Sequence, residues 1–294
     1  MFRLVYSIRI TVGKRAERVD CAEIRWYNRS VKRRKVARKR RKDMLYQAHR
    51  GVQKEYPENT MVSVRAAKEQ GYDVIEIDPA VTKDGVIVLM HDDTINRTAR
   101  KGGLAPDRPL DVRDVTFKEA NEYEYGSWFD PKFEGEKLPT LKEVVGYAKE
   151  NGMRVKVDNR YMRFSEADLN NFFAIFSYGA DNITFNCPSL EMAKEIKKRF
   201  PLCSIGFDGV TDEEELKKIT TALGSDVEIW IPIQAPQTEW WQKEFLNEKN
   251  AALVAKYAKL CVFLIDGEEE LRRVLTFCSP YAIETTGGVK PEKR

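Results

Sequence analysis

Two histidines and a pair of closely spaced acidic residues lie within one short stretch of the chain. His49 and His91 are the only histidines of the sequence, and Glu76 and Asp78 lie between them. Imidazole exchanges protons near neutral pH, so two histidines can supply a base and an acid. Carboxylates two residues apart in a strand face the same side, and two like charges so close need a shared cation. The pattern therefore predicts a hydrolytic site built on a metal ion.

A second segment, 155–160, offers a third carboxylate and two basic groups. It reads VKVDNR, and strand alternation would place Lys156, Asp158 and Arg160 on one face. We expect Asp158 to join Glu76 and Asp78 as a metal ligand. Oxygen ligands of this kind favour one divalent cation, Mg²⁺ or Ca²⁺, over zinc.

A formal charge count is consistent with a phosphate substrate if basic side chains offset the excess negative charge. Three carboxylates and a divalent cation leave one excess negative charge, and a phosphodiester adds another. Arg50 directly follows His49 and offers a fork of donors that suits phosphate. We expect Arg50, Arg160 and Lys156 to bind the substrate phosphate. The alternative for Arg50 is an ion pair at the rim of the site.

The elements that must position these residues alternate along the chain. Expected strands lie at 45–49, 73–78, 153–158, 182–186, 203–206, 228–233, 261–265 and 281–284. Helical patterns fill the intervals at 58–70, 140–151, 165–177, 188–199, 211–222, 239–258 and 267–278. Such alternation indicates an α/β fold with parallel strands and helical crossovers. Eight strands favour a TIM (β/α)8 barrel, with the site at the carboxyl ends of the strands. A doubly wound open sheet is the competing architecture.

One interval is too long for an ordinary connection. We expect residues 98–139, rich in turn residues and aromatics, to form a small inserted cap segment beside the site, after the second strand region. The aromatics of this insertion have two interpretations, and the sequence favours packing within the cap over lining the substrate entrance. In the second interpretation, Trp128, Phe129 and Phe133 would form an apolar entrance.

Charge separates the first 43 residues from the rest. They hold 16 Lys and Arg against 4 Asp and Glu, whereas residues 44–294 hold 34 against 42. Two interpretations stay open for residues 1–43: a solvated, disordered basic extension, or translated upstream sequence before a true start at Met44. The densest basic run, 32–42, is of a kind that sometimes binds nucleic acid or anionic membranes. No aromatic platform accompanies it, so nucleic acid is not an expected partner.

Composition otherwise describes an ordinary globular chain. Hydrophobic residues make up 42%, and no apolar run approaches the roughly 20 residues of a transmembrane helix. The five cysteines are odd in number and contain no CxxC pair. They suit reduced thiols in a cytoplasmic protein.

Taken together, these segments resemble the glycerophosphodiester phosphodiesterase family. The resemblance spans residues 44–291 and is densest in AHRG, PENT, GYDVIEID, TKDG and HDDTINRT, continuing through GSWFDPKFEGEKLPTL. It implies a TIM barrel, a divalent metal, and hydrolysis of a small-molecule glycerophosphodiester to glycerol 3-phosphate and an alcohol. It also implies residue roles: metal ligands Glu76, Asp78 and Asp158, acid–base histidines His49 and His91, and phosphate-contacting Arg50. We favour His49 as the base and His91 as the acid.

Departures from the family pattern concern the metal distance at one place and the substrate at two others. Asp158-Asn159-Arg160 stands where the family usually has Glu-x-Lys. The seventh strand begins at Cys261 without the usual Trp, and Glu284-Thr-Thr-Gly replaces a terminal Thr-Asp-x-Pro. Two alternatives therefore stay open: a lysophospholipase D-like phosphodiesterase, and a non-catalytic ligand-binding homologue.

Overall fold

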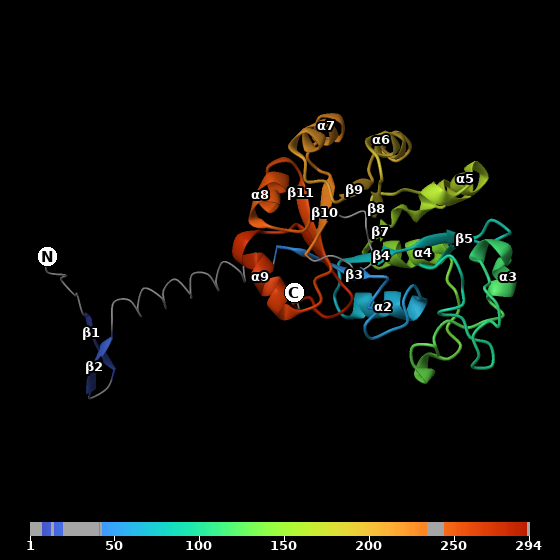
Figure 1. Cartoon of the computed structure of the whole chain (residues 1–294), viewed down its shortest axis with the longest axis horizontal. Helices are drawn as coiled ribbons and strands as arrows, with labels where there is room; N and C mark the ends of the chain where they lie inside the picture. The colour runs from blue at the N-terminus through green and yellow to red at the C-terminus, as the bar shows by residue number, and fades with distance from the viewer. Residues whose placement is uncertain (1–7, 13–14, 20–40, 42, 234–243, 293–294) are drawn as a thin grey trace.

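Eight parallel strands close into a barrel (Figure 1). The computed structural model describes residues 8–12, 15–19, 41, 43–233 and 244–292. In chain order the barrel strands are β3 (Leu45–His49), β4 (Val74–Ile77), β7 (Arg154–Val157), β8 (Ile183–Asn186), β9 (Ser204–Asp208), β10 (Glu228–Pro232), β11 (Lys259–Phe263) and β12 (Ala282–Thr285). The last strand, β12, pairs in parallel with β3 and closes the ring. The expected TIM barrel is confirmed, and the open-sheet alternative is wrong.

Helices follow the barrel strands at nearly the expected positions. They are α2 (Met61–Glu69), α4 (Leu141–Glu150), α5 (Glu166–Ala174), α6 (Leu190–Arg199), α7 (Glu213–Leu223), α8 (Glu248–Tyr257) and α9 (Glu268–Phe277). The expected helix at 239–258 is too long, because Asn247 caps α8 and residues 244–247 precede it. Residues 239–243 of that expectation lie outside the described residues.

Alternation along each strand separates the core from the site. On β4, Ile75 and Ile77 are fully buried in the main apolar cluster between barrel and helices. Glu76 lies between them on the opposite face of the strand, toward the inside of the barrel. Burial of the isoleucines therefore fixes which way the acidic side chain points.

The insertion after β4 has a small core of its own. Strands β5 (Pro79–Val81) and β6 (Ile87–Leu89) pair antiparallel outside the barrel. They are followed by η1 (Val112–Asp114), α3 (Phe117–Ala120) and η2 (Pro131–Phe133). The buried apolar residues of this core are Ala80, Val88, Met90, Ile95, Ala99, Val112, Ala120, Tyr125 and Leu138. The long interval is thus a packed unit attached to one side of the barrel.

Little of the N-terminal segment is described. Strands β1 (Ile8–Val12) and β2 (Arg15–Val19) pair antiparallel. Of the basic run 32–42, Arg41 alone lies within the described residues. Its guanidinium forms a bidentate ion pair with Glu268 of α9, at 2.7 and 2.9 Å. Among the described residues, no helix is long and apolar enough to span a membrane.

Candidate active site

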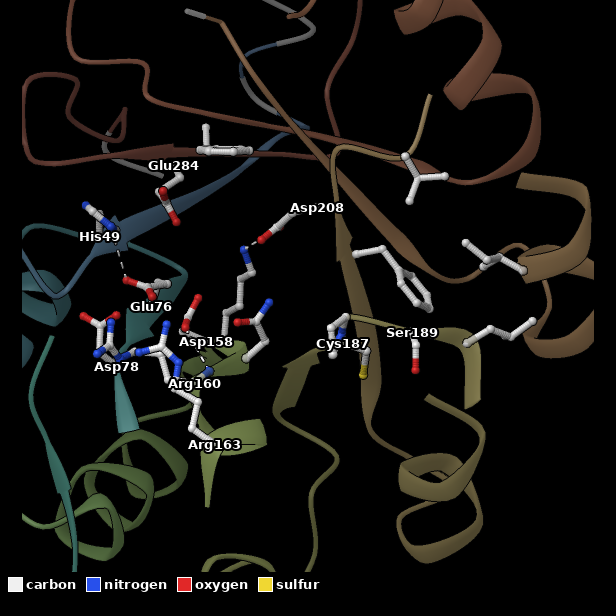
Figure 2. A pocket seen from close by; sticks show the side chains of 18 of the residues that line it. His49, Glu76, Asp78, Asp158, Arg160, Arg163, Cys187, Ser189, Asp208 and Glu284 are labelled. Atoms are coloured by element: carbon white, nitrogen blue, oxygen red, sulfur yellow. Dashed lines mark hydrogen bonds and ion pairs between the residues drawn. The ribbon is translucent and has the colours of Figure 1, made fainter. Parts of the chain in front are cut away.

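Three carboxylates meet at the carboxyl ends of β4 and β7. Glu76, Asp78 and Asp158 each offer an oxygen, and these atoms all lie within 4.8 Å of one another. Glu76 and Asp78 are buried, and Figure 2 shows all three in the pocket. We refer to these three residues as the carboxylate cluster. Residues that are 80 positions apart in sequence thus form one compact acidic group.

Burial and mutual repulsion disturb the protonation of the cluster. Burial raises the pKa of Glu76 well above its usual value, and the charge of Asp78 raises it further. Burial and Asp78 also raise the pKa of Asp158 to about 7. Burial pushes Asp78 the same way, but Arg50 and other neighbours outweigh it and lower the pKa of Asp78. The described protein supplies too little positive charge for three ionised acids, so a divalent cation fits this donor set.

A strained turn after β3 brings Arg50 to the cluster. Arg50 has φ 54° and Gly51 has φ 78°, a left-handed conformation that glycine tolerates best. A Cβ on Gly51 would lie 2.2 Å from the Ser63 hydroxyl. The Arg50 amide donates to Glu76 Oε2 at 3.0 Å, and its carbonyl accepts from the Asn59 amide at 3.0 Å. The AHRG and PENT segments therefore form one interlocked structure.

The two histidines have different surroundings. His49 Nε2 lies 3.8 Å from Glu76 Oε2, and its Nδ1 lies 2.6 Å from the Gln53 amide. Burial is the largest cause that lowers the pKa of His49, which keeps the ring neutral at pH 7. His91 Nδ1 lies 2.8 Å from Asp92 Oδ1, and 37% of its side chain is exposed. One ring is enclosed beside the cluster, and the other stands at a more open edge.

An arginine–carboxylate network adjoins the cluster, and we define it as Arg50, Glu58, Arg97 and Asp92. Glu58 accepts from Arg50 Nη1 at 3.1 Å and from Arg97 at 2.9 and 2.7 Å. Arg97 Nε also donates to Asp92 at 2.7 Å. The Nε of Arg50 lies 3.1 Å from Asp78 Oδ2, which joins the network to the cluster.

Lys156 lies deeper in the barrel than expected for a phosphate ligand. The side chain is 6% exposed, and its Nζ lies 3.7 Å from Asp208 and 4.1 Å from the ring centre of Trp230. Burial lowers its pKa, but Asp208 and other carboxylates outweigh burial and raise it. The ammonium is therefore charged and partly compensates the acids around it.

Arg160 does not continue the strand face of Lys156 and Asp158, as the alternation suggested. Strand β7 ends at Val157, and Asp158 caps η3 (Asn159–Arg163) by accepting from the Arg160 amide at 3.0 Å. The Arg160 guanidinium pairs with Asp93 at 2.9 Å. It still lines the pocket, but from a turn above the strand.

The predicted site residues all line one pocket of about 1060 Å³: His49, Arg50, Glu76, Asp78, His91, Lys156, Asp158 and Arg160. On the side away from the cluster, an apolar wall stands among the charged residues Glu191, Asp212, Glu215 and Lys218; it is made by Leu190, Phe207, Val210, Ile219, Phe263 and Leu264. Figure 2 places Cys187 and Ser189 on that far side. The pocket is thus charged on one side and partly apolar on the other.

The aromatics of the insertion do not form the entrance, so that interpretation is wrong. Phe129 packs against Trp128 and Phe133, and Phe133 packs against Tyr56. Of the described residues that line the pocket, none lies between 92 and 139. The apolar wall comes instead from β9, from the end of β11 and from the segments around α6 and α7.

Comparison with known proteins identifies the family. The model of the glycerophosphoryl diester phosphodiesterase family matches residues 49–230, more than half of the chain. The chain belongs to this family. The Bacillus subtilis protein YhdW is 32% identical over 162 residues, which cover 54% of this chain and 64% of that relative. The glycerophosphodiester phosphodiesterase of Caldanaerobacter subterraneus is 43% identical over 97 residues, covering 33% and 37%. The chain thus spans less than two thirds of the length of these relatives.

Solved structures share the fold. A phosphodiesterase from Oleispira antarctica, in complex with the product sn-glycerol-3-phosphate, has a TM-score of 0.66 and 19% identity. The alignment covers 83% of this chain and 93% of that one. A glycerophosphodiester phosphodiesterase from Thermotoga maritima has a TM-score of 0.58 at 20% identity, covering 83% and 95%. These likenesses establish a common barrel.

Sequence reasoning missed several site residues of this family member. Asp208, the last residue of β9, and Glu284, near the end of β12, also line the pocket. The signal that could have found them is the one that indicated Glu76: a polar side chain near the carboxyl end of an apolar run. Glu58 and Arg97 gave no such signal, because their pairing depends on the folded insertion.

Proposed function

We propose that this protein is a metal-dependent phosphodiesterase that hydrolyses glycerophosphodiesters to glycerol 3-phosphate and an alcohol. The observation that carries the proposal is the approach of Glu76, Asp78 and Asp158 within 4.8 Å, with His49 and His91 on the same pocket. Family membership supports the reaction type. The product bound to the Oleispira antarctica phosphodiesterase supports the substrate class.

The substrate phosphate lies, in this proposal, between the cluster and the basic side chains. A divalent cation on the three carboxylates, Mg²⁺ or Ca²⁺, supplies Lewis-acid polarisation of the phosphoryl group when bound. Arg50 and Arg160 donate to phosphate oxygens. Lys156, held deeper by Asp208, acts mainly through its charge. Together these groups offset the negative charge of the phosphodiester.

His49 is the base in this mechanism. Burial favours its neutral ring, which can accept a proton from the attacking hydroxyl. Base function at Nε2 requires that Nδ1 carry the ring proton. The Gln53 side chain can accept a hydrogen bond from that protonated Nδ1, because rotating its amide by 180° places the oxygen where the nitrogen lies, 2.6 Å away.

His91 is the acid. As the attacking oxygen bonds to phosphorus, the bond from phosphorus to the alcohol oxygen breaks. His91 delivers a proton to that oxygen, so the alcohol leaves neutral. The contact from Nδ1 to Asp92 leaves Nε2 as the nitrogen that can transfer the proton.

Turnover assays test the proposal. Glycerophosphocholine and related diesters are incubated with Mg²⁺, Ca²⁺ or Mn²⁺, and with EDTA. We expect release of glycerol 3-phosphate that EDTA abolishes. His91→Ala should lower kcat by about 10²–10⁴-fold while the fold is retained. Near-normal turnover in that variant would remove His91 from the mechanism.

The apolar wall favours a second candidate. Leu190, Val210 and Ile219 line the pocket opposite the cluster, where an acyl chain could lie. A lysophospholipase D-like activity would use this wall. A head-to-head assay of glycerophosphocholine against lysophosphatidylcholine separates the two. Tight ligand binding without metal-dependent turnover would instead support a non-catalytic homologue.

We also propose that residues 44–294 are the catalytic unit, with the insertion at about 98–139 as its cap. The free thiols of Cys187, Cys203 and Cys261 support a reducing, cytoplasmic location. Deleting residues 1–40 should leave turnover unchanged, and a loss would assign the basic segment a role in the reaction.

A further inference from the structure

The reaction as described leaves three charged residues beside the site without a role. We propose that Asp92, Arg97 and Glu58 are positioning residues that hold His91 and Arg50 in one fixed arrangement. The inference rests on the proposed function, because it takes His91 as the acid that protonates the leaving alcohol.

Asp92 is held from two sides. Its Oδ1 lies 2.8 Å from His91 Nδ1, and its Oδ2 accepts from Arg97 Nε at 2.7 Å. Oδ1 also accepts from Arg97 Nη2 at 3.2 Å. Both partners present donors, so both carboxylate oxygens are needed as acceptors. Asp92 thereby fixes the rotation of the His91 ring through an arginine that is itself anchored.

Glu58 links two parts of the site: the histidine arm, which is His91 with Asp92, and the phosphate arm, which is Arg50. Its side chain is 10% exposed and accepts three guanidinium bonds, one from Arg50 and two from Arg97. The chain of contacts runs from His91 through Asp92, Arg97 and Glu58 to Arg50 without a break. A shift of one arm therefore disturbs the other, although they come from different loops.

The insertion supports this arrangement from behind. The Arg97 guanidinium lies over the Trp128 ring, 5.4 Å from its centre, a cation–π distance. Trp128 Nε1 donates to the Tyr125 carbonyl at 3.0 Å, and Tyr125 belongs to the core of the insertion. Residues 98–139 thus support Arg97 and, through it, His91, while none of them lines the pocket.

A pair of substrates distinguishes positioning from a general structural role. Glycerol 3-phosphate esters of ethanol and of p-nitrophenol differ in the alcohol that leaves. Ethanol needs a proton as it departs, whereas p-nitrophenolate leaves without one. A residue that acts through the acid matters for the ethyl ester and little for the aryl ester.

Asp92→Asn is the main variant, because asparagine keeps the shape but offers one acceptor oxygen to two donors. We expect kcat for the ethyl ester to fall roughly 10- to 100-fold, with KM unchanged, and the aryl ester to lose less than about threefold. Asp107→Asn, an exposed position of the same insertion, is the matched control and should behave as wild type. Circular dichroism and melting curves verify that each variant is folded.

Glu58→Gln tests the link between the arms. Glutamine can accept at one oxygen, so Arg50 and Arg97 can no longer share it fully. We expect KM to rise for both esters, through Arg50, and kcat to fall further for the ethyl ester, through His91. Equal kcat losses on the two esters, or no kcat loss on either, would show that Glu58 does not couple the two arms.

The outcomes separate this inference from the proposed function. Equal losses on the two esters in Asp92→Asn, or no loss, overturn the positioning role, while His91→Ala still shows its own selective loss on the ethyl ester. Equal losses in His91→Ala overturn the assignment of the acid and the inference with it. No metal-dependent turnover of either ester by the wild type overturns the proposed function itself.

Discussion

The carboxylate cluster and the arginine–carboxylate network meet where Arg50 contacts Asp78, and their charges are compensated differently. The carboxylate cluster contains three buried or half-buried acids, two of which have raised pKa values. The arginine–carboxylate network contains two arginines and two acids, each paired within 3.2 Å. The cluster has a donor set that fits a cation, whereas the formal charges of the network cancel. In the proposed function, the cluster therefore serves binding and the network serves the positioning of side chains.

The sharpest way to test this contrast is to neutralise one member of the cluster. Glu76→Gln should abolish metal-dependent turnover, with a loss on the order of 10³-fold, because metal polarisation is worth several kcal/mol. Its unfolding free energy in EDTA should change by less than about 1 kcal/mol, since burial already favours the protonated acid. Activity assays and denaturant melts measure the two effects. A large stability loss with activity retained would reverse the comparison.

Cation binding should stabilise the cluster and leave the network unaffected. At a cation concentration about 100 times Kd, the wild type should gain about 2.7 kcal/mol of unfolding free energy. Asp158→Asn should lose most of this gain, whereas Glu58→Gln should keep it. Thermal melts with Mg²⁺, Ca²⁺ and EDTA provide the measurement. Equal gains in the wild type and Asp158→Asn would place the cation elsewhere.

Neutralising Glu58 of the network should lower the unfolding free energy, unlike the neutralisation of Glu76, in addition to its expected effects on KM and kcat. Glu58→Gln leaves two arginines without their shared partner, which should cost about 2 kcal/mol, less than a fully buried pair because Arg97 is 40% exposed. Burial raises the pKa of Glu58, but Arg97 and Arg50 outweigh it and lower that pKa.

The lowered pKa sets the direction of the pH dependence. The stability that Glu58 contributes is fully present above its unfolded pKa of about 4.3 and is lost as pH falls through the lower folded value. The difference between wild type and Glu58→Gln should therefore shrink below about pH 4. Denaturant melts from pH 7 to pH 3 measure this difference. Glu122→Gln, which removes a solvent-exposed ion pair with Lys101, is the control. A difference that grows on acidification would contradict the assignment.

How far the sequence predicted the two groups follows from their origins. The cluster comes from strand ends, where two-residue alternation and apolar flanks indicate direction, so Glu76, Asp78 and Asp158 could be predicted together. The strand face expected for Arg160 was wrong, because Asp158 caps a 3-10 helix and the strand stops before it. The Asp-Asn pair was a signal for this turn.

The network could not be predicted from the same patterns. Glu58 and Arg97 are 39 residues apart and meet only because the insertion packs on its own core. The barrel strands and the helices expected at 140–151 and 188–199 followed from local patterns and are confirmed. Side-chain pairing between loops has no periodic signal, which is why it had to be observed.

The smallest effect is expected at an ion pair outside both groups. Arg41→Ala removes the contact to Glu268 at the start of α9, and partly exposed pairs contribute about 1 kcal/mol or less. A melt of the full-length variant measures it, and turnover should match the wild type. A loss of several kcal/mol would make Arg41 an integral part of the barrel.

The insertion braces one side of the mouth and leaves the other side to α6 and α7. The groups to which we assign phosphate chemistry come from β3, β4, β7 and the loop after β6, while Leu190, Val210 and Ile219 belong to separate loops and helices. Mutations on that far wall can accumulate without moving an acid, a base or a ligand. In the proposed reaction, substitutions at these apolar positions would therefore change which alcohol is accepted and leave the chemical step in place.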